Sequence, residues 1–240
     1  MPTIDDVRAR LRRIGQEHVL QFCDDLSDAE HHALLKQIES LDLDAVPRWI
    51  DEYVRTRPGS ETPSDLEPVR AYPRDPRSPA DPSRKWDRSH YLSVGERLIR
   101  AGKVGAFTVA GGQGSRLGFD GPKGVFPAGA VTEKPLFVCI AEWILAARRR
   151  YDAPIPWCVM TSPLNHKQTI EYFEANNYCG LPKSDVIFFQ QGVMPSFEAS
   201  SGRLLLSGKG EIATNPDGPG GSLRALHTSG RDPDGALAAR

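Results

Sequence analysis

Residues Val104 to Gly124 read VGAFTVAGGQGSRLGFDGPKG and contain the clearest structural signal of this sequence. The short apolar run from Val104 to Ala110 predicts a buried strand, which leads directly into Gly111–Gly114. Glycine tolerates positive φ, so a backbone of this kind can pass close to a ligand and turn its N–H groups toward it. Two cations follow, Arg116 and Lys123, and both suit phosphate oxygens. This stretch therefore predicts a polyphosphate site at the end of a strand.

Two familiar phosphate-binding motifs do not match this loop. A Walker A loop has Ser or Thr after its lysine, whereas Gly124 follows Lys123 here. The dinucleotide fingerprint G-x-G-x-x-G also fails, because Ser115, Arg116 and Leu117 separate Gly114 from the next glycine. An ordinary glycine-rich surface turn with incidental charges remains the alternative interpretation.

Composition narrows the class of protein. The chain has 240 residues, with 30 basic and 31 acidic side chains and a net charge of −1, so it lacks the basic excess of a nucleic-acid-binding surface. Its four cysteines form no C-x-x-C pair, which indicates free thiols in a reducing compartment. No apolar run is long enough to span a bilayer. We expect a cytoplasmic protein with small-molecule substrates and with no nucleic-acid or membrane partner.

The order of the predicted elements indicates an α/β fold. Apolar residues at helical spacing predict three short helices in a helical N-terminal region, residues 1–56. Seven prolines mark residues 57–85 as an extended or mobile connector. In residues 86–240, strands alternate with helices, which favours a mostly parallel sheet with helices on both faces. The predicted helices are Tyr91–Ala101, Pro135–Arg150 and Asn165–Ala175, and the predicted strands after the first are Ile155–Thr161 and Asp185–Gln190.

Two further patterns complete the chain. Arg148, Arg149 and Arg150 end the second of these helices, where solvated cations complement the negative end of the helix dipole. Residues 203–213 predict a hairpin, and a second glycine cluster, residues 215–221, leads into a helix at Ser222. Such a turn at a helix N-terminus suits an anion or a nucleotide, although an ordinary loop explains it equally well.

Five motifs in a fixed order resemble a known family. They are residues 109–118 (VAGGQGSRLG), 122–124 (PKG), 160–162 (MTS), 186–192 (VIFFQQG) and 216–221 (PDGPGG). This series resembles the UDP-sugar pyrophosphorylases of the UDP-N-acetylglucosamine pyrophosphorylase type, a branch of the nucleotidyltransferases. The resemblance covers most of the chain, and Gly15–His18 with the helical run after it is similar to the helical front end of that family.

The resemblance implies a Rossmann-like nucleotidyltransferase fold that joins UTP and a sugar 1-phosphate into a UDP-sugar and pyrophosphate. It implies that Arg116 and Lys123 hold the triphosphate and that Lys123 offsets charge on the departing pyrophosphate. It also implies that Gln191 contacts the uracil edge and that Gly218 packs on the nucleoside. The backbone residues that it places against the uridine and phosphates are Val109, Ala110, Gly111 and Gly112. In-line attack on the α-phosphorus needs positioning and charge stabilisation, for which Mg²⁺ is the expected ion.

Two departures from the family leave alternatives open. Pro219 stands where the family usually has an Asn that contacts the sugar, so N-acetylglucosamine, glucose and galactose 1-phosphates all remain candidates. The metal-binding Asp of the family and a later Lys would fall beyond Arg240, and the unpatterned stretch from Thr228 to Gly235 is a poor end for a domain. We therefore expect the N-terminal part of a longer enzyme. A uridine-nucleotide-binding module without catalysis is the main alternative, and a plain α/β domain with glycine turns is another.

Overall fold

The computed structural model describes residues 3–56, 65–69, 71–76 and 84–229. The chain divides into two compact units, the first formed by Met1–Leu66 with Val193–Asp217 and the second by Glu67–Gly192 with Gly218–Arg240. Each unit has its own buried core. The predicted helical region 1–56 lies in the first unit, together with residues 193–217, which the sequence grouped with the nucleotidyltransferase domain.

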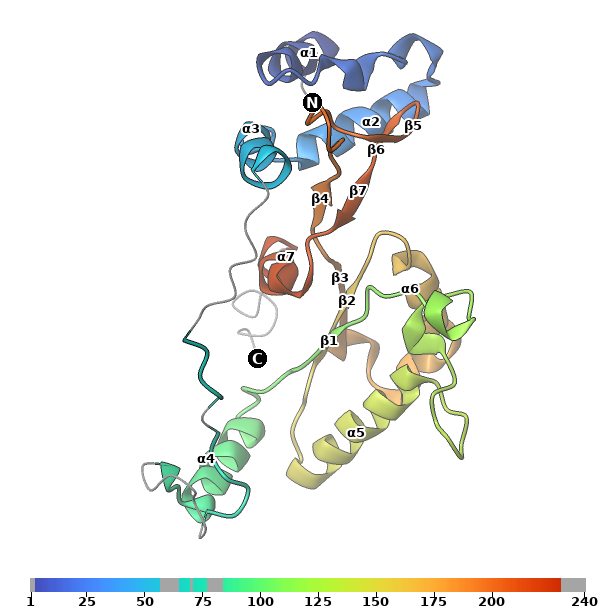
Figure 1. The fold of residues 1–240 in the computed structure, drawn as a ribbon. Coiled ribbons are helices and arrows are strands. Elements are labelled where there is room, and N and C mark those ends of the chain that lie inside the picture. Colours follow the sequence, from blue (N-terminus) through green and yellow to red (C-terminus); the bar gives the residue numbers. More distant parts are fainter. Residues whose placement is uncertain (1–2, 57–64, 70, 77–83, 230–240) are drawn as a thin grey trace. The chain divides into compact units, whose positions relative to one another are not determined.

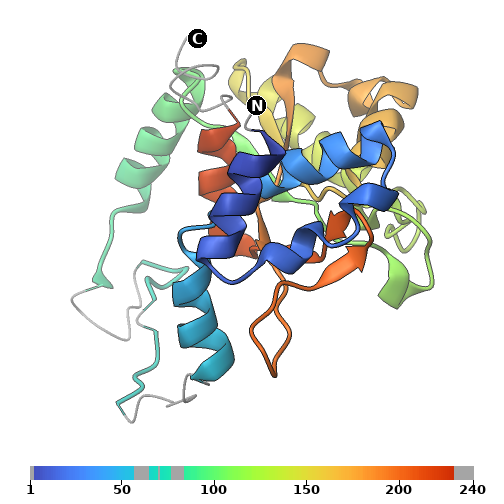
Figure 2. The same ribbon diagram turned by 90° about the horizontal axis from the view of Figure 1, so that it is seen from above.

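The first unit combines short helices with two small β-sheets. Helices α1 and α2 each begin with a capping box, in which Thr3 pairs with Asp6 and Ser27 with Glu30. Figure 2 shows α1 and α2 side by side, as does Figure 1. The helical elements of the first unit are α1 (Ile4–Arg13), η1 (Glu17–Leu20), η2 (Cys23–Asp25), α2 (Asp28–Ser40), α3 (Val46–Trp49) and the π-helical η3 (Ile50–Arg55). Its strands are β4 (Val193–Pro195), β5 (Leu206–Gly208), β6 (Glu211–Ile212) and β7 (Thr214–Pro216).

Two glutamine side chains bind the β-segments of this unit to its helices. Gln16, which is 3% exposed, donates to the carbonyl of Gly202 at 3.2 Å and accepts from the N–H of Leu204 at 2.8 Å. The Gln37 side chain likewise donates to the carbonyl of Ile212 and accepts from its backbone N–H. Each amide thus satisfies a backbone donor and acceptor that a neighbouring strand would otherwise pair. The predicted hairpin is confirmed, because β5 and β6 pair in antiparallel fashion.

The second unit is built on a parallel sheet of three strands. Strand β1 (Ala106–Val109) pairs with β2 (Trp157–Thr161), and β2 pairs with β3 (Val186–Gln190). Its helical elements are α4 (Arg88–Arg100), η5 (Ser115–Leu117), η6 (Lys123–Val125), α5 (Leu136–Tyr151), α6 (His166–Ala175), η7 (Asn177–Gly180), η8 (Lys183–Asp185), η9 (Pro219–Gly221) and α7 (Ser222–Thr228). Because the strands run parallel, their carboxyl ends all lie at one edge of the sheet.

Helices cover both faces of this sheet, as Figure 1 shows. On one face, α5 and α6 contribute Phe137 and Phe173 to a core that contains Trp157 of β2. On the other face, Ala225 and Leu226 of α7 pack against β2 and β3. The prediction of an α/β fold with a mostly parallel sheet and a helical N-terminal region is confirmed.

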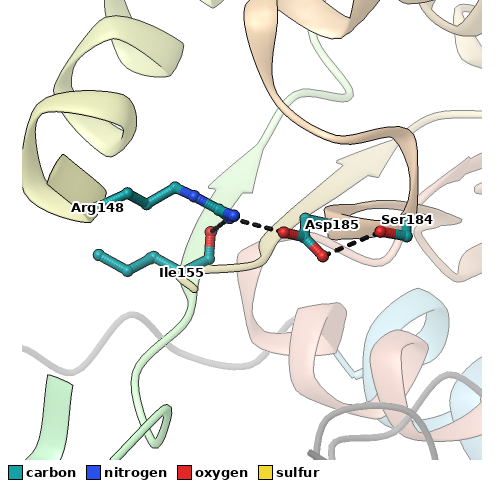
Figure 3. Close-up of polar contacts among 4 residues, drawn as sticks. All are labelled: Arg148, Ile155, Ser184 and Asp185. Atoms are coloured by element: carbon teal, nitrogen blue, oxygen red, sulfur yellow. Dashed lines mark hydrogen bonds and ion pairs between the residues drawn. The ribbon is translucent and has the colours of Figure 1, made fainter. Parts of the chain in front are cut away.

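The end of α5 differs from its sequence interpretation. Arg148 is not a solvated cation, because its side chain is 19% exposed and lies 2.7 Å from the carboxylate of Asp185, which is 5% exposed. Figure 3 shows the guanidinium between this carboxylate and the carbonyl of Ile155, with Ser184 donating to the other carboxylate oxygen. The arginine therefore joins α5 to the start of β3, while Arg149 and Arg150 are exposed as expected.

Some predictions lie wholly or partly outside the described residues. Most of the predicted connector 57–85 falls there, namely residues 57–64, 70 and 77–83, as do residues 230–235 of the unpatterned stretch Thr228–Gly235. Within the ranges that the structure describes, no helix has the length and apolar content needed to cross a membrane.

Candidate functional site

The glycine loop, residues Ala110–Gly114, begins where β1 ends. The N–H of Gly114 donates to the carbonyl of Gly121 at 2.9 Å, and the N–H of Lys123 donates to the carbonyl of Gly112 at 3.0 Å. These two bonds fold the chain back so that Lys123 returns to the loop. Gly112 and Lys123 are 11 positions apart in the sequence, and the turn brings them into one site.

The glycine loop presents backbone donors that lack an acceptor. Among the hydrogen bonds of the described residues, none has the N–H of Gly111, Gly112 or Gln113 as its donor. Gly112 is exposed and Gly111 and Gln113 are half-buried, so these neighbouring N–H groups at the edge of the sheet are open to an anion. This conformation supports the phosphate-site interpretation that the sequence suggested.

Gln191 lies directly against this loop. The residue is 8% exposed, and its backbone N–H donates to the carbonyl of Thr161 at the end of β2. A Cβ built on Gly111 would lie 2.7 Å from Oε1 and 3.2 Å from Nε2 of Gln191. The absence of a side chain at Gly111 thus allows an amide, with both a donor and an acceptor, to stand beside the free N–H groups.

Lys123 stands over Gly112. A Cβ on Gly112 would lie 3.7 Å from the Lys123 Nζ, and the lysine is exposed. The next residue, Gly124, is buried against the ring of Phe137, which fills the space that a side chain would need. The backbone of the turn that carries Lys123 is therefore fixed by close packing against α5.

The remaining predicted site residues are less closely joined. Val109 is 49% exposed at the end of β1, and Ala110 is half-buried. Arg116 is exposed on η5. Gly218 has φ of 78°, which favours glycine, and nothing lies within 4 Å of the place its Cβ would take. The structure thus joins Gly111 with Gln191 and Gly112 with Lys123, whereas it shows no such pairing for Arg116 or Gly218.

One residue at this site was missed by the sequence interpretation. Asn165 is fully buried at the start of α6, and its Nδ2 donates to the carbonyls of Ala110 at 2.9 Å and Gly112 at 3.3 Å. The sequence marked it only as the beginning of a helix. Its place shortly after the carboxyl end of a predicted strand was the available signal, because residues there share the edge of the sheet with the glycine loop.

The charge of the site is cationic. Within the described ranges, no group of three His, Cys, Asp or Glu side chains is arranged to hold a metal ion. The first charged side chains that follow the loop in sequence are Arg116, Asp120 and Lys123. The site therefore offers backbone N–H groups, an amide and an ammonium, which together suit a phosphorylated ligand bearing a hydrogen-bonding ring.

Comparison with known proteins identifies the family of this chain. Residues 84–231 match the UTP–glucose-1-phosphate uridylyltransferase family, named UDPGP. The chain belongs to the UDPGP family. This match includes β1, the glycine loop, Lys123, Gln191 and Gly218.

Individual UDPGP relatives agree over nearly the whole chain. It is 36% identical over 233 residues to UDP-N-acetylglucosamine diphosphorylase 2 of Arabidopsis thaliana, a match that covers 92% of this chain and 45% of the relative. It is 34% identical to the human UDP-N-acetylhexosamine pyrophosphorylase-like protein 1, covering 94% of this chain and 46% of the relative. The crystal structure of the Trypanosoma brucei uridine diphosphate N-acetylglucosamine pyrophosphorylase in complex with inhibitor matches with a TM-score of 0.68 and 28% identity, over 94% of this chain and 45% of that chain. The chain thus spans less than half the length of these UDPGP relatives.

Proposed function

We propose that this protein binds UTP at the glycine loop and serves a uridylyltransferase reaction that converts UTP and a sugar 1-phosphate into a UDP-sugar and pyrophosphate. The observation that supports this most directly is the set of free N–H groups at Gly111, Gly112 and Gln113 beside Lys123 and Gln191. Membership of the UDPGP family supports the same reaction.

Each part of the site has a proposed role. The loop N–H groups and Arg116 hold phosphate oxygens, while the backbone at Val109 and Ala110 lies along the nucleoside. Gln191 contacts the uracil edge, since an amide can donate to one carbonyl oxygen and accept from the ring N–H. Gly218 packs on the nucleoside.

The reaction needs no covalent bond to the protein. An oxygen of the sugar phosphate attacks the α-phosphorus of UTP, the bond from that phosphorus to the bridging oxygen breaks, and pyrophosphate leaves. Lys123 offsets the negative charge that grows on the departing group. Holding both anions in line lowers the entropic part of the barrier.

Mg²⁺ is the metal ion that we propose for this reaction. The described residues form no cluster of three potential ligands for the ion. Mg²⁺ is commonly bound through substrate phosphates with one or two carboxylates, so the nucleotide itself is its proposed carrier here.

The relatives favour one sugar. Several are named for UDP-N-acetylglucosamine, so N-acetylglucosamine 1-phosphate is the first candidate, with the glucose and galactose 1-phosphates next. A cytoplasmic location remains part of the proposal.

Titration calorimetry with UTP tests this function, with and without Mg²⁺. We expect saturable binding that falls about 10-fold to 100-fold in Lys123→Ala, because a charge-assisted phosphate contact is lost. Lys103→Ala is the matched control, since this exposed lysine precedes β1 at the opposite edge of the sheet and should leave binding unchanged. Absence of UTP binding would reject the proposal. UTP binding without release of pyrophosphate from UTP in the presence of any of the three sugar 1-phosphates would instead favour a nucleotide-binding module.

A further inference from the structure

A single buried side chain connects the glycine loop to the neighbouring strand and helix. Asn165 lies between the end of β2 and the first turn of α6. Its Oδ1 accepts from the N–H of Ser162 at 2.9 Å, and its Nδ2 donates to two carbonyls of the loop. With no exposed surface, this amide uses both of its ends inside the protein.

The bonds of Asn165 fix the orientation of two peptide groups. In a trans peptide the C=O and the N–H point in opposite directions, and the described chain contains no cis peptide. Because the carbonyl of Ala110 points toward Asn165, the N–H of Gly111 points away from it. In the same way, the carbonyl of Gly112 points toward Asn165, so the N–H of Gln113 points away from it.

These orientations determine what the loop presents to a ligand. Carbonyl oxygens repel phosphate and N–H groups attract it, and glycine peptides rotate easily because they lack a Cβ. The carbonyl of Gly112 also accepts a hydrogen bond from the N–H of Lys123. Among the described residues, Asn165 alone donates to the carbonyl of Ala110. The first peptide of the loop is thus the one most dependent on Asn165.

We propose that Asn165 is a positioning residue that holds the glycine loop with its N–H groups directed at the nucleotide phosphates. It acts through the backbone and does not touch the ligand. A loop already oriented before binding avoids the entropic cost of ordering it, so the side chain raises affinity without adding a ligand contact. The nucleotide part of this proposal rests on the proposed function, while the ordering of the loop does not.

Two variants and one control separate this role from simple stability. Asn165→Ala removes all three bonds, and Asn165→Ser leaves a hydroxyl that is too short to reach both carbonyls. Neither variant removes a helix cap, because the Asn165 side chain makes no capping bond to α6. Thr169→Val is the control, because Thr169 is fully buried one turn further along α6 and its hydroxyl has no partner among the described residues. Circular dichroism establishes that each variant is folded.

The amide signals of Gly111 and Gly112 in the nuclear magnetic resonance spectrum report the order of the loop without any ligand. In both Asn165 variants we expect these signals to shift toward unstructured values or broaden, while the signal of Gly180, which lies in η7 beyond the C-terminal end of α6, stays fixed. Affinity for UTP should fall about 10-fold, the effect of losing two neutral hydrogen bonds that order the site. Thr169→Val should change neither measurement.

The outcomes distinguish the two proposals. Unchanged loop signals together with UTP affinity within about 2-fold of the wild type, in either folded Asn165 variant, would overturn the role of Asn165 and leave the proposed function intact. If the wild-type protein fails to bind UTP, the proposed function is rejected. The loop signals of the free protein then still decide whether Asn165 orders the loop.

Discussion

Gln191 occupies the space that a side chain on Gly111 would fill, since a Cβ there would lie 2.7 Å from Gln191 Oε1. The contact joins the end of β1 to the residue that follows β3, across the carboxyl edge of the sheet. A methyl group at Gly111 must therefore displace the amide or the loop.

Gly111→Ala should lower the affinity for UTP by about 10-fold or more, because the amide of Gln191 can no longer stand beside the free N–H groups. Gly105→Ala is the control at the other end of β1, where a Cβ would meet the Pro156 carbonyl at an ordinary 3.4 Å. Calorimetry on both variants measures the difference. Equal affinities would show that the Gln191 amide has no part in nucleotide binding.

Arg148→Ala should destabilise the second unit by about 3 kcal/mol, because it leaves the buried Asp185 carboxylate without its arginine. Arg149→Ala, which removes an exposed cation from the same turn, should change the free energy of unfolding by less than about 0.5 kcal/mol. Urea unfolding measures both variants. Similar losses in the two would mean that the charge at the end of α5, not the pairing with Asp185, stabilises the unit.

Gln16→Leu should destabilise the first unit by about 2 to 4 kcal/mol, since the buried backbone at Gly202 and Leu204 would lose its partners. Gln37→Leu removes the equivalent pair of bonds at a half-buried position, where water can replace them, so its loss should be smaller. Thermal unfolding of the two variants compares them. A larger effect at Gln37 would contradict this ranking.

Cys179 should resist alkylation in the folded protein. Burial raises the pKa of its thiol to about 11 and also raises the pKa of the Cys158 thiol. The reactive form is the thiolate, so at pH 8 both thiols should react with iodoacetamide much more slowly than in the denatured chain, where the pKa is about 8.5.

The same shift predicts how stability varies with pH. The Cys179 thiol stays neutral in the folded state while the unfolded state ionises, so its contribution to stability is present below pH of about 8.5 and is lost as the pH rises toward about 11. Cys179→Ser should reduce this alkaline loss. Rapid labelling of Cys179 at pH 8 in the native protein would show that partial burial does not raise the pKa of its thiol.

The sequence by itself determined the local elements and the chemistry of the loop. Short apolar runs identified β1, β2 and β3, and apolar periodicity identified the helices between them. The prediction that β1 is buried was wrong, because its residues alternate between half-buried and exposed. Glycines next to cations identified a phosphate site, since backbone freedom and positive charge are properties of residue type. The order of the motifs then indicated a resemblance to the UDP-sugar pyrophosphorylases, and the comparison established membership of the UDPGP family.

Only the tertiary structure decided which distant residues meet. Asn165 was predicted to begin a helix, and Arg148 to be solvated, because each has a sufficient local explanation; their partners Ala110 and Asp185 lie 55 and 37 residues away. The sequence also did not predict that residues 193–217 form one unit with the N-terminal helices. The hydrogen bonds that join them connect residues more than 170 positions apart. The domain boundaries at residues 56 and 85 and the roles of the site residues remain predictions. Sequence patterns report on burial and conformation within a few residues, whereas the pairing of buried polar groups depends on how the packed elements bring them together.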